Sequence, residues 1–467
     1  MINNSKVLIA SRVFSVEHQY DFARLSGDTN KMHLDPVYAR RTIAGQRVVF
    51  GIFGLMWALE SFVSLMETKP SSIAVNFLKP IFLDEEVFCL WDHEHQRLEI
   101  SNPTTVLTEV KIRFDNKFAL ISGSILCKPA FKVPFERRID DLKKIPSQDF
   151  FFRGDVQLSS LTFPKLSLAY GQEVCCEMAA ISEIVGMQIP GLHSMLLALN
   201  IKFSESHAKP SFSIKNIHEK FNILTMAVHG VSLVAEVKAL LRPEPTCGSS
   251  MINLKENIQG DEFRKVRALI IGGSRGLGES VAKIIALGGG DTVITFASGD
   301  IDALNVATEI RDFGGRCSHI KLKLPDDLGM LGNLGEFNQV YYFATPKIFG
   351  KRGLEYDPSL LCSFREIYVE SFKKVIEHFN CSFQKTWIYY PSTVAIDEPI
   401  NELAEYIDAK IEGEKLCSGL TGVNNTFVHA TRIPRTKTDQ TMTVTNIHAV
   451  NPEDVMLPVI RKMMESI

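Results

Sequence analysis

The sequence has 467 residues, a formal net charge of −3, 45% hydrophobic residues and 22% charged residues. These values are typical of a soluble globular protein, and they exclude a disordered chain, a fibrous protein and the strongly basic surface of a nucleic-acid-binding protein. At about 150 residues per domain, the length predicts about three domains. The longest apolar run, Val48 to Leu59, is shorter than the ~20 residues of a membrane-spanning helix, so we expect no membrane span.

The amino terminus and the cysteines both favour a cytoplasmic protein. The first residues, Met-Ile-Asn-Asn-Ser-Lys, lack the apolar segment of a secretory signal. The nine cysteines are an odd number and include no Cys-x-x-Cys pair. We therefore expect reduced cysteines and no metal site.

The first segment with a chemical signature is Phe22–Pro36, FARLSGDTNKMHLDP, which is followed by the turn Val48-Val-Phe-Gly51. This string resembles the MaoC-like, (R)-specific enoyl hydratase family, whose hot-dog fold wraps a sheet around one long helix. The resemblance implies that Asp28 and His33 bind and activate a water molecule. It also implies that the backbone N–H of Gly51, at the start of the long helix, binds the thioester oxygen.

An alternative for Asp28 and His33 is a hydrogen-bonded turn, in which Asp28 is a cap and His33 is a structural imidazole. The complete string favours catalysis over this alternative, and Asn30 is then expected to orient the loop. Two departures from the family pattern flank the site. Lys31-Met32 replaces a proline and an aliphatic residue, and Phe50 replaces a histidine.

One order of predicted elements occurs twice in the first half of the sequence. A helix within residues 48–66 is followed by strands within 71–82 and 106–114, and a helix within 168–185 is followed by strands within 193–203 and 231–241. This order predicts two copies of a sheet wrapped around one helix, with chance similarity of amphipathic segments as the alternative.

With the family resemblance, the repeat predicts a MaoC-like hot-dog domain at residues 1–130 and a second, degenerate hot-dog domain at 131–245. The second copy has no Asp-x4-His motif before its helix. It is therefore expected to complete the sheet and the acyl tunnel of the first copy. His193 and Asp155, which lie in the second copy, are expected to be structural.

The composition changes after Leu241, where RPEPTCGSS brings in two prolines and a glycine and predicts a linker at residues 246–264. From Arg267 onward, short apolar runs alternate with helical stretches, as in a parallel sheet with crossover helices. The expected fold is an α+β double hot-dog region followed by an α/β doubly wound (Rossmann) domain at residues 265–467.

A glycine-rich turn follows the first predicted strand of this last domain. Glycines permit a tight turn and a close approach to a pyrophosphate, which then rests on the helix N-terminus. The expected cofactor-binding residues share this turn and the start of the next helix: they are Gly272, Ser274, Arg275, Gly276, Leu277 and Gly278.

The glycine spacing resembles the short-chain dehydrogenase/reductase family, and so does Tyr406-Ile-Asp-Ala-Lys410. The spacing of four puts Tyr406 and Lys410 on one helix face, where the lysine charge is expected to lower the tyrosine pKa. The resemblance implies that Tyr406 exchanges a proton with the substrate oxygen and that Lys410 also holds the nicotinamide ribose. Thr393, 13 residues before Tyr406, or the adjacent Ser392 is expected to hold the substrate carbonyl.

Some positions depart from that family's pattern. Ile271 replaces its threonine before the first glycine, residues 343–346 (FATP) replace its Asn-Asn-Ala-Gly, and its helix asparagine is missing near Tyr368. The stretch TVITFASGD has no acidic residue at the strand end, and Ser274 and Arg275 lie near the place of a 2′-phosphate. We therefore expect NADP(H) rather than NAD(H) as the cofactor. Asp300, a few residues further on, is an acidic residue that favours NAD(H) instead.

The two resemblances together predict a bifunctional enzyme for acyl-CoA or acyl-carrier-protein thioesters. A hydratase/dehydratase of this type and a ketoacyl reductase share the 3-hydroxyacyl thioester, so the product of one site is the substrate of the other. Two alternatives are a reductase for a sugar or other carbonyl in surface-polysaccharide synthesis and a nucleotide-binding scaffold with at most one live site. By analogy with both families, we expect a homo-oligomer.

Overall fold

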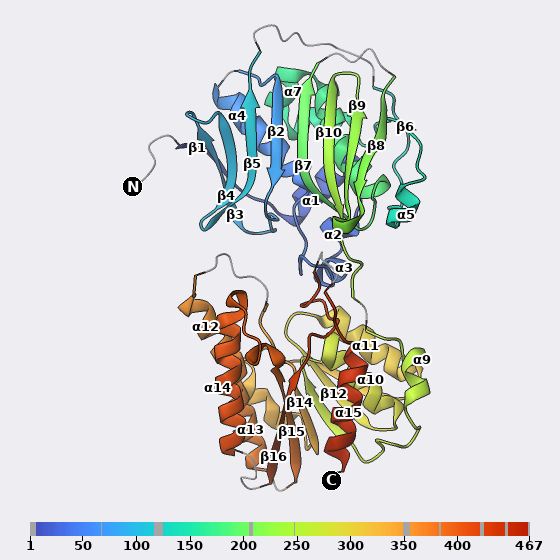
Figure 1. The fold of residues 1–467 in the computed structure, drawn as a ribbon, viewed down its shortest axis with the longest axis vertical. Coiled ribbons are helices and arrows are strands. Elements are labelled where there is room, and N and C mark those ends of the chain that lie inside the picture. Colours follow the sequence, from blue (N-terminus) through green and yellow to red (C-terminus); the bar gives the residue numbers. More distant parts are fainter. Residues whose placement is uncertain are drawn as a thin grey trace. The chain divides into compact units, whose positions relative to one another are not determined.

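A computed structural model of the protein describes residues 6–66, 68–115, 125–204, 209–246, 248–348, 355–382, 384–420, 425–443 and 447–465. The chain forms two compact units, Met1–Glu244 and Pro245–Ile467 (Figure 1). Among the described residues, no helix combines the length and the apolar character that a membrane crossing requires.

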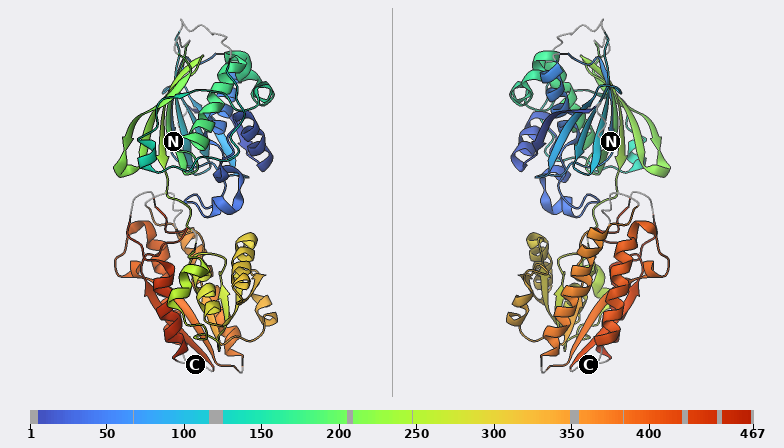
Figure 2. Two further views of the ribbon diagram at one scale, coloured as in Figure 1. Left: turned by 90° about the vertical axis from the view of Figure 1, so that its right-hand side faces the viewer. Right: turned by 90° about the vertical axis from the view of Figure 1, so that its left-hand side faces the viewer.

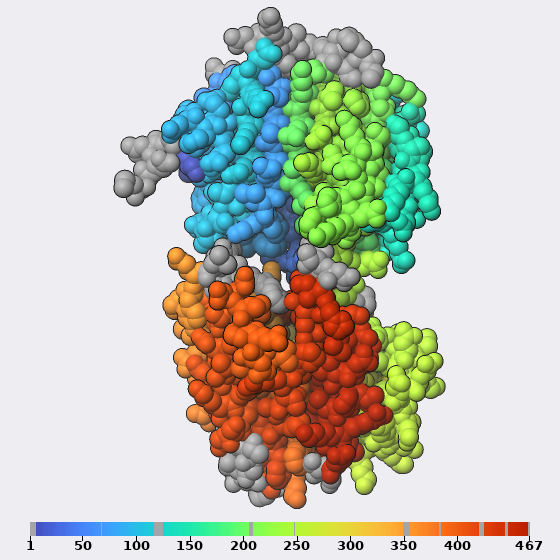
Figure 3. All heavy atoms as spheres, viewed as in Figure 1, coloured from blue at the N-terminus to red at the C-terminus, as the bar shows by residue number. Residues whose placement is uncertain are grey.

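The first unit is built on a single ten-stranded sheet with the order β1-β3-β4-β5-β2-β7-β10-β9-β8-β6. The order of the first five strands is mirrored by the last five, and the antiparallel pair β2–β7 joins the two halves (Figure 1). In the space-filling view, the blue first half and the green second half of this unit lie directly side by side (Figure 3). The strands are β1 (Lys6–Val13), β2 (Ser72–Phe77), β3 (Glu86–Asp92), β4 (Arg97–Asn102), β5 (Thr105–Arg113), β6 (Gln148–Asp149), β7 (Ser194–Phe203), β8 (Ser211–His218), β9 (Ile223–His229) and β10 (Leu233–Leu241).

The main helices of this unit lie together on one face of the sheet (Figure 2). The apolar sequence of α4 leaves almost no polar face, so this helix is buried on nearly all sides between the sheet and the other helices. One hydrophobic core contains residues of both halves. The helices are α1 (Val16–Ser26), α2 (Lys31–Leu34), α3 (Pro36–Arg40), α4 (Gly51–Met66), α5 (Ile139–Leu142), α6 (Val156–Thr162), α7 (Pro164–Tyr170) and α8 (Gln172–Glu183).

The helix predicted within residues 168–185 is not continuous. Gly171 has a φ of 91°, which suits glycine and separates α7 from α8. After α8 the chain continues as a π-helical segment, Ile184–Gln188. This wider turn brings Gly186 against the first half of the unit.

The second unit has a six-stranded parallel sheet with the order β13-β12-β11-β14-β15-β16, the strand order of doubly wound dinucleotide-binding sheets. The sequence analysis identified five of these strands and missed β13, whose sequence RCSHIK is mostly polar because it lies at the sheet edge. The strands are β11 (Arg267–Ile271), β12 (Asp291–Phe296), β13 (Arg316–Lys321), β14 (Gln339–Tyr342), β15 (Thr386–Thr393) and β16 (Thr426–Ile433).

Helices cover both faces of this sheet. Alternate residues of β11 enter different cores: Ile270 packs with α10, α11 and α15, and Ile271 packs with α13. A second π-helical segment, Glu366–Ser371, connects α12 with α13. The helices are α9 (Met251–Leu254), α10 (Gly276–Leu287), α11 (Asp300–Asp312), α12 (Pro358–Arg365), α13 (Phe372–Asn380), α14 (Ala404–Leu420) and α15 (Pro452–Met464).

The segment 246–264, predicted as a linker, is largely a packed part of the second unit. Met251, Leu254 and Phe263 are buried in the core beside α10. The backbone N–H of Met251 donates to the Glu309 carboxylate of α11 over 2.9 Å. The linker prediction was based on the proline- and glycine-rich start of the segment and did not take account of the apolar residues that follow it.

Candidate functional site

Asp28 lies on the loop after α1, pressed against the second half of the first unit. Its carboxylate accepts hydrogen bonds from the backbone N–H of Asn30 over 3.0 Å and from the hydroxyl of Ser182 in α8 over 2.8 Å. Only 1% of Asp28 is exposed. A Cβ atom on Gly186 would lie 2.4 Å from the carboxylate, so the glycine makes room for it.

This burial changes the protonation of Asp28. Removal from water raises the pKa of its carboxyl to about 7, although both hydrogen bonds favour the charged form. The neighbouring Glu183 is also buried, which raises its pKa to about 8. At neutral pH, Asp28 is therefore close to half ionised, beside a carboxyl group that is mainly neutral.

His33 belongs to the short helix α2 and is held in one tautomer. Its Nδ1 lies 2.8 Å from the Val48 carbonyl oxygen, which can only accept, so Nδ1 carries the proton and Nε2 keeps a lone pair. The ring stacks on Phe50 with 3.9 Å between centroids. Burial lowers the pKa of His33 to about 4, and the charge of Arg242 adds to this effect.

Asn30 fixes the loop that carries both residues. Its side-chain oxygen accepts from the N–H of Met32 at the start of α2, and its amide nitrogen donates to the carbonyls of Gly186 and Leu192 over 2.8 and 3.2 Å. The loop is thereby bound to the segment between α8 and β7. This geometry agrees with the role that the sequence analysis gave to Asn30.

Gly51 is the first residue of the 16-residue helix α4. The N–H groups of a first helical turn have no acceptor within the helix, and the helix dipole favours negative charge there. A Cβ atom on Gly51 would lie 3.1 Å from the Phe77 ring. Glycine at this position thus allows the Phe77 ring to pack against the N-terminus of α4.

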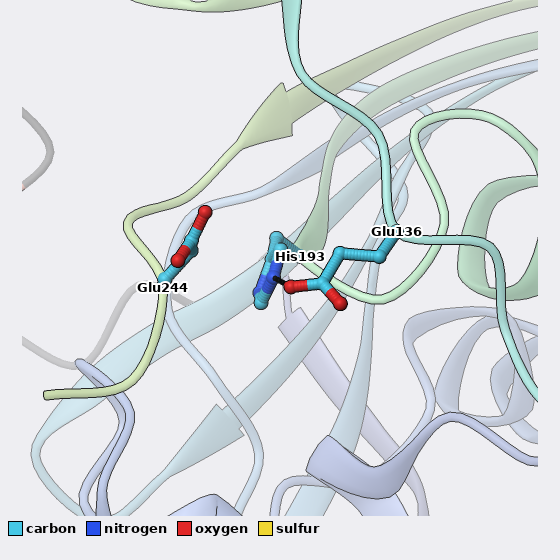
Figure 4. Close-up of side chains that lie close together, drawn as sticks. All are labelled: Glu136, His193 and Glu244. Atoms are coloured by element: carbon cyan, nitrogen blue, oxygen red, sulfur yellow. Dashed lines mark hydrogen bonds and ion pairs between the residues drawn. The ribbon is translucent and has the colours of Figure 1, made fainter. Parts of the chain in front are cut away.

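Asp155 and His193, which the sequence analysis expected to be structural, both form hydrogen bonds within the first unit. Asp155 caps α6 by accepting the N–H of Gln157 over 3.0 Å. His193 lies with Glu136 and Glu244 in a group whose ligand atoms are within 4.8 Å of one another (Figure 4). Both nitrogens of the His193 ring already have protein partners, Glu136 at 2.9 Å and the Tyr38 hydroxyl at 3.3 Å.

Arg242, at the end of β10, connects this group to the loop of the first half. It is 2% exposed and donates to the Tyr38 hydroxyl over 3.0 Å and to the Leu192 carbonyl over 2.9 Å. The sequence analysis singled out neither Arg242 nor Ser182. Both lie more than 150 residues from Asp28 in the sequence, so no local spacing marks them.

In the second unit, the glycine turn after β11 has the geometry of a nucleotide cradle. Gly272 has a φ of 86°, and a Cβ atom there would lie 2.9 Å from the Phe343 carbonyl oxygen. A Cβ atom on Gly278 would lie 2.3 Å from the Gly272 carbonyl oxygen. The turn opens α10 at the point where the strand order reverses, so its residues fit a dinucleotide. Ser274 is buried in this turn, and Leu277 packs on the core.

Arg275 is ion-paired in this structure. Its Nη1 lies 2.6 Å from the carboxylate of Asp439, which belongs to the chain after β16. Gly276 adjoins the same chain, because a Cβ atom there would lie 3.4 Å from the Thr438 methyl group. Asp300 begins α11 with an exposed side chain. A 2′-phosphate at Arg275 would therefore compete with Asp439.

Tyr406 and Lys410 share one face of α14, but the expected charge effect is wrong. Burial raises the pKa of Tyr406 to about 12, against the opposing effect of a hydrogen bond with Thr393. Burial also lowers the pKa of Lys410 to about 7. The Lys410 ammonium group donates to the Pro391 carbonyl over 2.7 Å and lies 5.8 Å from the Tyr406 ring centroid.

The structure distinguishes between the two candidate hydroxyls of β15. Thr393 is the partner of Tyr406, whereas the Ser392 hydroxyl donates to Glu414 over 2.5 Å. Adjacent residues of a strand point to opposite faces, so only one of the two can adjoin Tyr406. Glu414 is also paired with Arg432. These contacts further disfavour Ser392 as the residue that holds the substrate carbonyl.

Tyr368 lies in the region where the sequence lacks the helix asparagine of the short-chain dehydrogenase/reductase pattern. It lies in the second π-helical segment, and its ring is 3.9 Å from the Lys410 ammonium group. Its hydroxyl forms a short hydrogen bond with the hydroxyl of Thr345, after β14. Tyr368 thus encloses Lys410 on the side away from Pro391.

One family model matches part of the first unit. Residues 6–112 match the model of the MaoC like domain. This segment, which includes Asp28, His33 and Gly51, is a MaoC-like domain. None of the curated proteins matches the chain.

Solved structures of reductases are also similar to the chain. The angucycline C-6 ketoreductase LanV with bound NADP is 18% identical, with a TM-score of 0.38, over 43% of this chain and 90% of that one. A dehydrogenase/reductase from Sinorhizobium meliloti 1021 is 19% identical, with a TM-score of 0.38, over 42% and 86%. FolM alternative dihydrofolate reductase 1 from Brucella suis, in complex with NADP, is 16% identical, with a TM-score of 0.38, over 44% and 91%.

The contact between Gly186 and Asp28 generates a stability prediction. Gly186→Ala places a methyl group within 2.4 Å of a buried carboxylate, and we expect a loss of about 1–3 kcal/mol in the free energy of unfolding, measured by urea denaturation. Gly419→Ala is the matched control, since nothing lies within 4 Å of its Cβ position. Equal effects of the two substitutions would contradict the close packing on Asp28.

Proposed function

We propose that the chain is a bifunctional acyl-thioester enzyme. The first unit acts as an (R)-specific 2-enoyl hydratase/3-hydroxyacyl dehydratase, and the second acts as an NADP(H)-dependent 3-ketoacyl/3-hydroxyacyl oxidoreductase. What supports the proposal is that Asp28 and His33 are both buried in the segment that matches the MaoC-like domain, where Asn30 fixes the loop that carries them; burial raises the pKa of Asp28 to about 7 and lowers that of His33 to about 4. Near neutral pH, the first is a base of useful strength and the second is a neutral acceptor.

We further propose that the first unit is a pair of hot-dog units, residues 1–130 and 131–245. The mirrored strand order and the two long helices on one face of the sheet support this division. The second copy has no Asp-x4-His motif before its helix, but it supplies Ser182 and Gly186 to the site of the first. It acts as the wall of the active site, with the acyl chain held between the two halves.

The Asp28 carboxylate and Nε2 of His33 are both hydrogen-bond acceptors, and together they orient a water molecule for attack. A water that donates one hydrogen to the Asp28 carboxylate and the other to Nε2 of His33 presents its oxygen lone pair to the β-carbon of an enoyl thioester. Asp28 is the stronger base by about three pKa units, so it takes the proton. The same carboxyl group then returns a proton to the α-carbon, and the site ends in its starting state.

The N-terminus of α4 supplies the remaining part of the reaction. As the hydroxyl adds, negative charge develops on the thioester oxygen, and the N–H of Gly51 donates to it. The helix dipole acts in the same direction. Since the donor belongs to a buried helix, it needs no rearrangement during the reaction.

In the second unit, the high pKa of Tyr406 favours reduction of a ketone. A phenol with a pKa of about 12 stays protonated at neutral pH and can donate its proton to a substrate oxygen. A bound nicotinamide cofactor would supply the hydride. Thr393 holds the carbonyl beside Tyr406, and the glycine turn with Lys410 holds the cofactor.

The two reactions share an intermediate. Reduction gives a 3-hydroxyacyl thioester, which the first unit dehydrates to an enoyl thioester. Protonated Tyr406 and the expected use of NADPH favour this direction, toward acyl assembly.

The surroundings of Lys410 favour a second candidate for the reductase unit. Its side chain is buried, bonded to Pro391 and enclosed by Tyr368, and its low pKa leaves it largely uncharged at slightly alkaline pH. A unit in this state binds a nucleotide without turnover. In that case the first unit is the only active one.

The central test is hydration of crotonyl-CoA, followed by loss of enoyl absorbance. We expect kcat/KM to rise tenfold per pH unit up to about pH 7 and then to level off, because Asp28 must be ionised and His33 is already neutral. Asp28→Asn should lower the rate at least ~100-fold with the fold intact by circular dichroism. A fully active Asp28→Asn variant would exclude the proposed base.

Ser182→Ala tests the contribution of the second half. The lost hydrogen bond favoured the carboxylate, so the pKa of Asp28 should rise by about one unit and the pH profile should shift upward with it. Ser159→Ala is the control, since this buried hydroxyl bonds to Val156 instead. An unchanged pH profile for Ser182→Ala would show that the Ser182 hydroxyl does not affect the pKa of the reacting carboxyl group.

Asp439→Asn tests the cofactor preference through the reduction of acetoacetyl-CoA. The substitution removes the carboxylate that would compete with a 2′-phosphate for Arg275, so the preference in kcat/KM for NADPH over NADH should rise about tenfold. Asp326→Asn, which breaks an exposed ion pair with Lys323, should change neither value. Tyr406→Phe should abolish turnover with both cofactors. If the wild-type protein reduces acetoacetyl-CoA with neither NADPH nor NADH, the alternative of nucleotide binding without turnover holds.

A further inference from the structure

A solvent-open cavity of about 390 Å³ lies outside both proposed sites, in the second half of the first unit. Its lining includes two cationic side chains, Arg137 and Lys144, and two amides, Gln148 and Gln188. A volume of this size accommodates a small organic group. The Gln148 and Gln188 amide nitrogens already donate to the Pro146 carbonyl and to the Glu183 carboxylate. The anion-binding character of the lining therefore comes from the two cations.

Within the part of the chain that the structure describes, neither cation of the cavity forms a close ion pair, although the charge of Asp141 acts on Arg137. Among the described residues, no carboxylate lies within ion-pairing distance of Arg137 or Lys144, whereas the adjacent Lys143 is paired with Asp140 and Glu219 at 3.0 and 3.1 Å. Asp141 also lines the cavity, but its carboxylate accepts the backbone N–H of Arg138 over 3.0 Å.

Arg137 is held in place and partly removed from water. Its guanidinium group donates to the Gln188 carbonyl and lies 4.4 Å from the Phe135 ring centroid. Burial lowers its pKa. The charge of Asp141 acts on Arg137 in the opposite direction to burial, and Lys144 is exposed to solvent. The two cations at one cavity attract an anion, although neither requires one to be stable.

The cavity shares a wall with the proposed hydratase site. On one side of the segment 186–192, Asn30 donates to the carbonyl of Gly186, and Gly186 contacts the Asp28 carboxylate. On the other side, the N–H of Phe135 donates to the Met187 carbonyl over 2.8 Å, and Arg137 and Gln188 follow. A ligand in the cavity is thus separated from the Asp28 loop by one stretch of chain.

We propose that this cavity binds the phosphate-bearing end of the thioester carrier. This inference rests on the proposed hydratase function. The pantetheine arm of CoA and that of an acyl-carrier protein both end in a phosphate ester, which is the anion that an arginine and a lysine recognise. The arm would then run past the segment 186–192 and bring the thioester to Asp28, His33 and Gly51.

The test compares two neighbouring lysines in the full-length protein. Lys144→Ala removes an exposed cation of the cavity, whereas Lys143→Ala removes one that is paired elsewhere. Isothermal titration calorimetry with CoA should give a Kd about tenfold higher for Lys144→Ala and unchanged for Lys143→Ala. Equal Kd values for wild type and Lys144→Ala, or equal losses in the two variants, would overturn the proposal.

Probes that contain parts of the carrier identify the source of the phosphate. Adenosine 3′,5′-bisphosphate, 4′-phosphopantetheine and inorganic phosphate are titrated in the same way. Sensitivity of adenosine bisphosphate binding to Lys144→Ala indicates CoA, and sensitivity of phosphopantetheine binding indicates a carrier protein or CoA through its inner phosphate. If only inorganic phosphate responds, the cavity is a general anion site and the proposal is wrong.

Kinetics separate this inference from the proposed function. With crotonyl-CoA, Lys144→Ala should raise KM about tenfold and leave kcat unchanged. With crotonyl-pantetheine, which has no phosphate, the variant should equal wild type. If wild type hydrates neither thioester, the proposed function fails, and calorimetry still decides whether the cavity binds the carrier. An equal rise in KM for both thioesters would contradict a phosphate contact at Lys144.

Discussion

The antiparallel pairing of β2 with β7 is the contact on which the first unit depends. It sets Ile73 opposite Ile201 and Val75 opposite Leu199, and all four side chains are buried in one core. This pairing makes one sheet from two halves that are far apart in the sequence. As a result, α8 and the segment after it lie against the loop of Asp28, and the site has walls from both halves.

Burial explains the acid–base properties of both proposed sites. Removal from water disfavours charge whatever its sign, so it raises the pKa of Asp28 and Tyr406 and lowers that of His33 and Lys410. In the first unit the result is an acid–base pair with a well-defined direction of proton transfer. In the second, the same effect keeps the phenol protonated and leaves the lysine weakly charged.

The sequence predicts those features that are encoded locally. The Asp28–His33 string, the glycine turn and five of the six parallel strands each lie within a short window, and periodicity or spacing identifies them. Local spacing does not identify the residues that reach the loop from the second half of the unit, because only the folded sheet brings them there. These residues are Ser182, Gly186 and Arg242. The spacing of Tyr406 and Lys410 gives their shared helix face but not their burial, which is why the expected pKa shift has the wrong sign. The choice between Ser392 and Thr393 depends on which face of β15 adjoins α14, and that also requires the fold.

The contact of Gly186 with Asp28 has a consequence for how this protein can be divided. A catalytic string that matches a known domain over residues 6–112 suggests a module that ends there. Yet the carboxylate needs a hydroxyl from position 182 and an absent side chain at position 186. A fragment that ends at residue 112 would lack both contacts, so the piece that keeps the surroundings of Asp28 intact is the whole compact unit of residues 1–244.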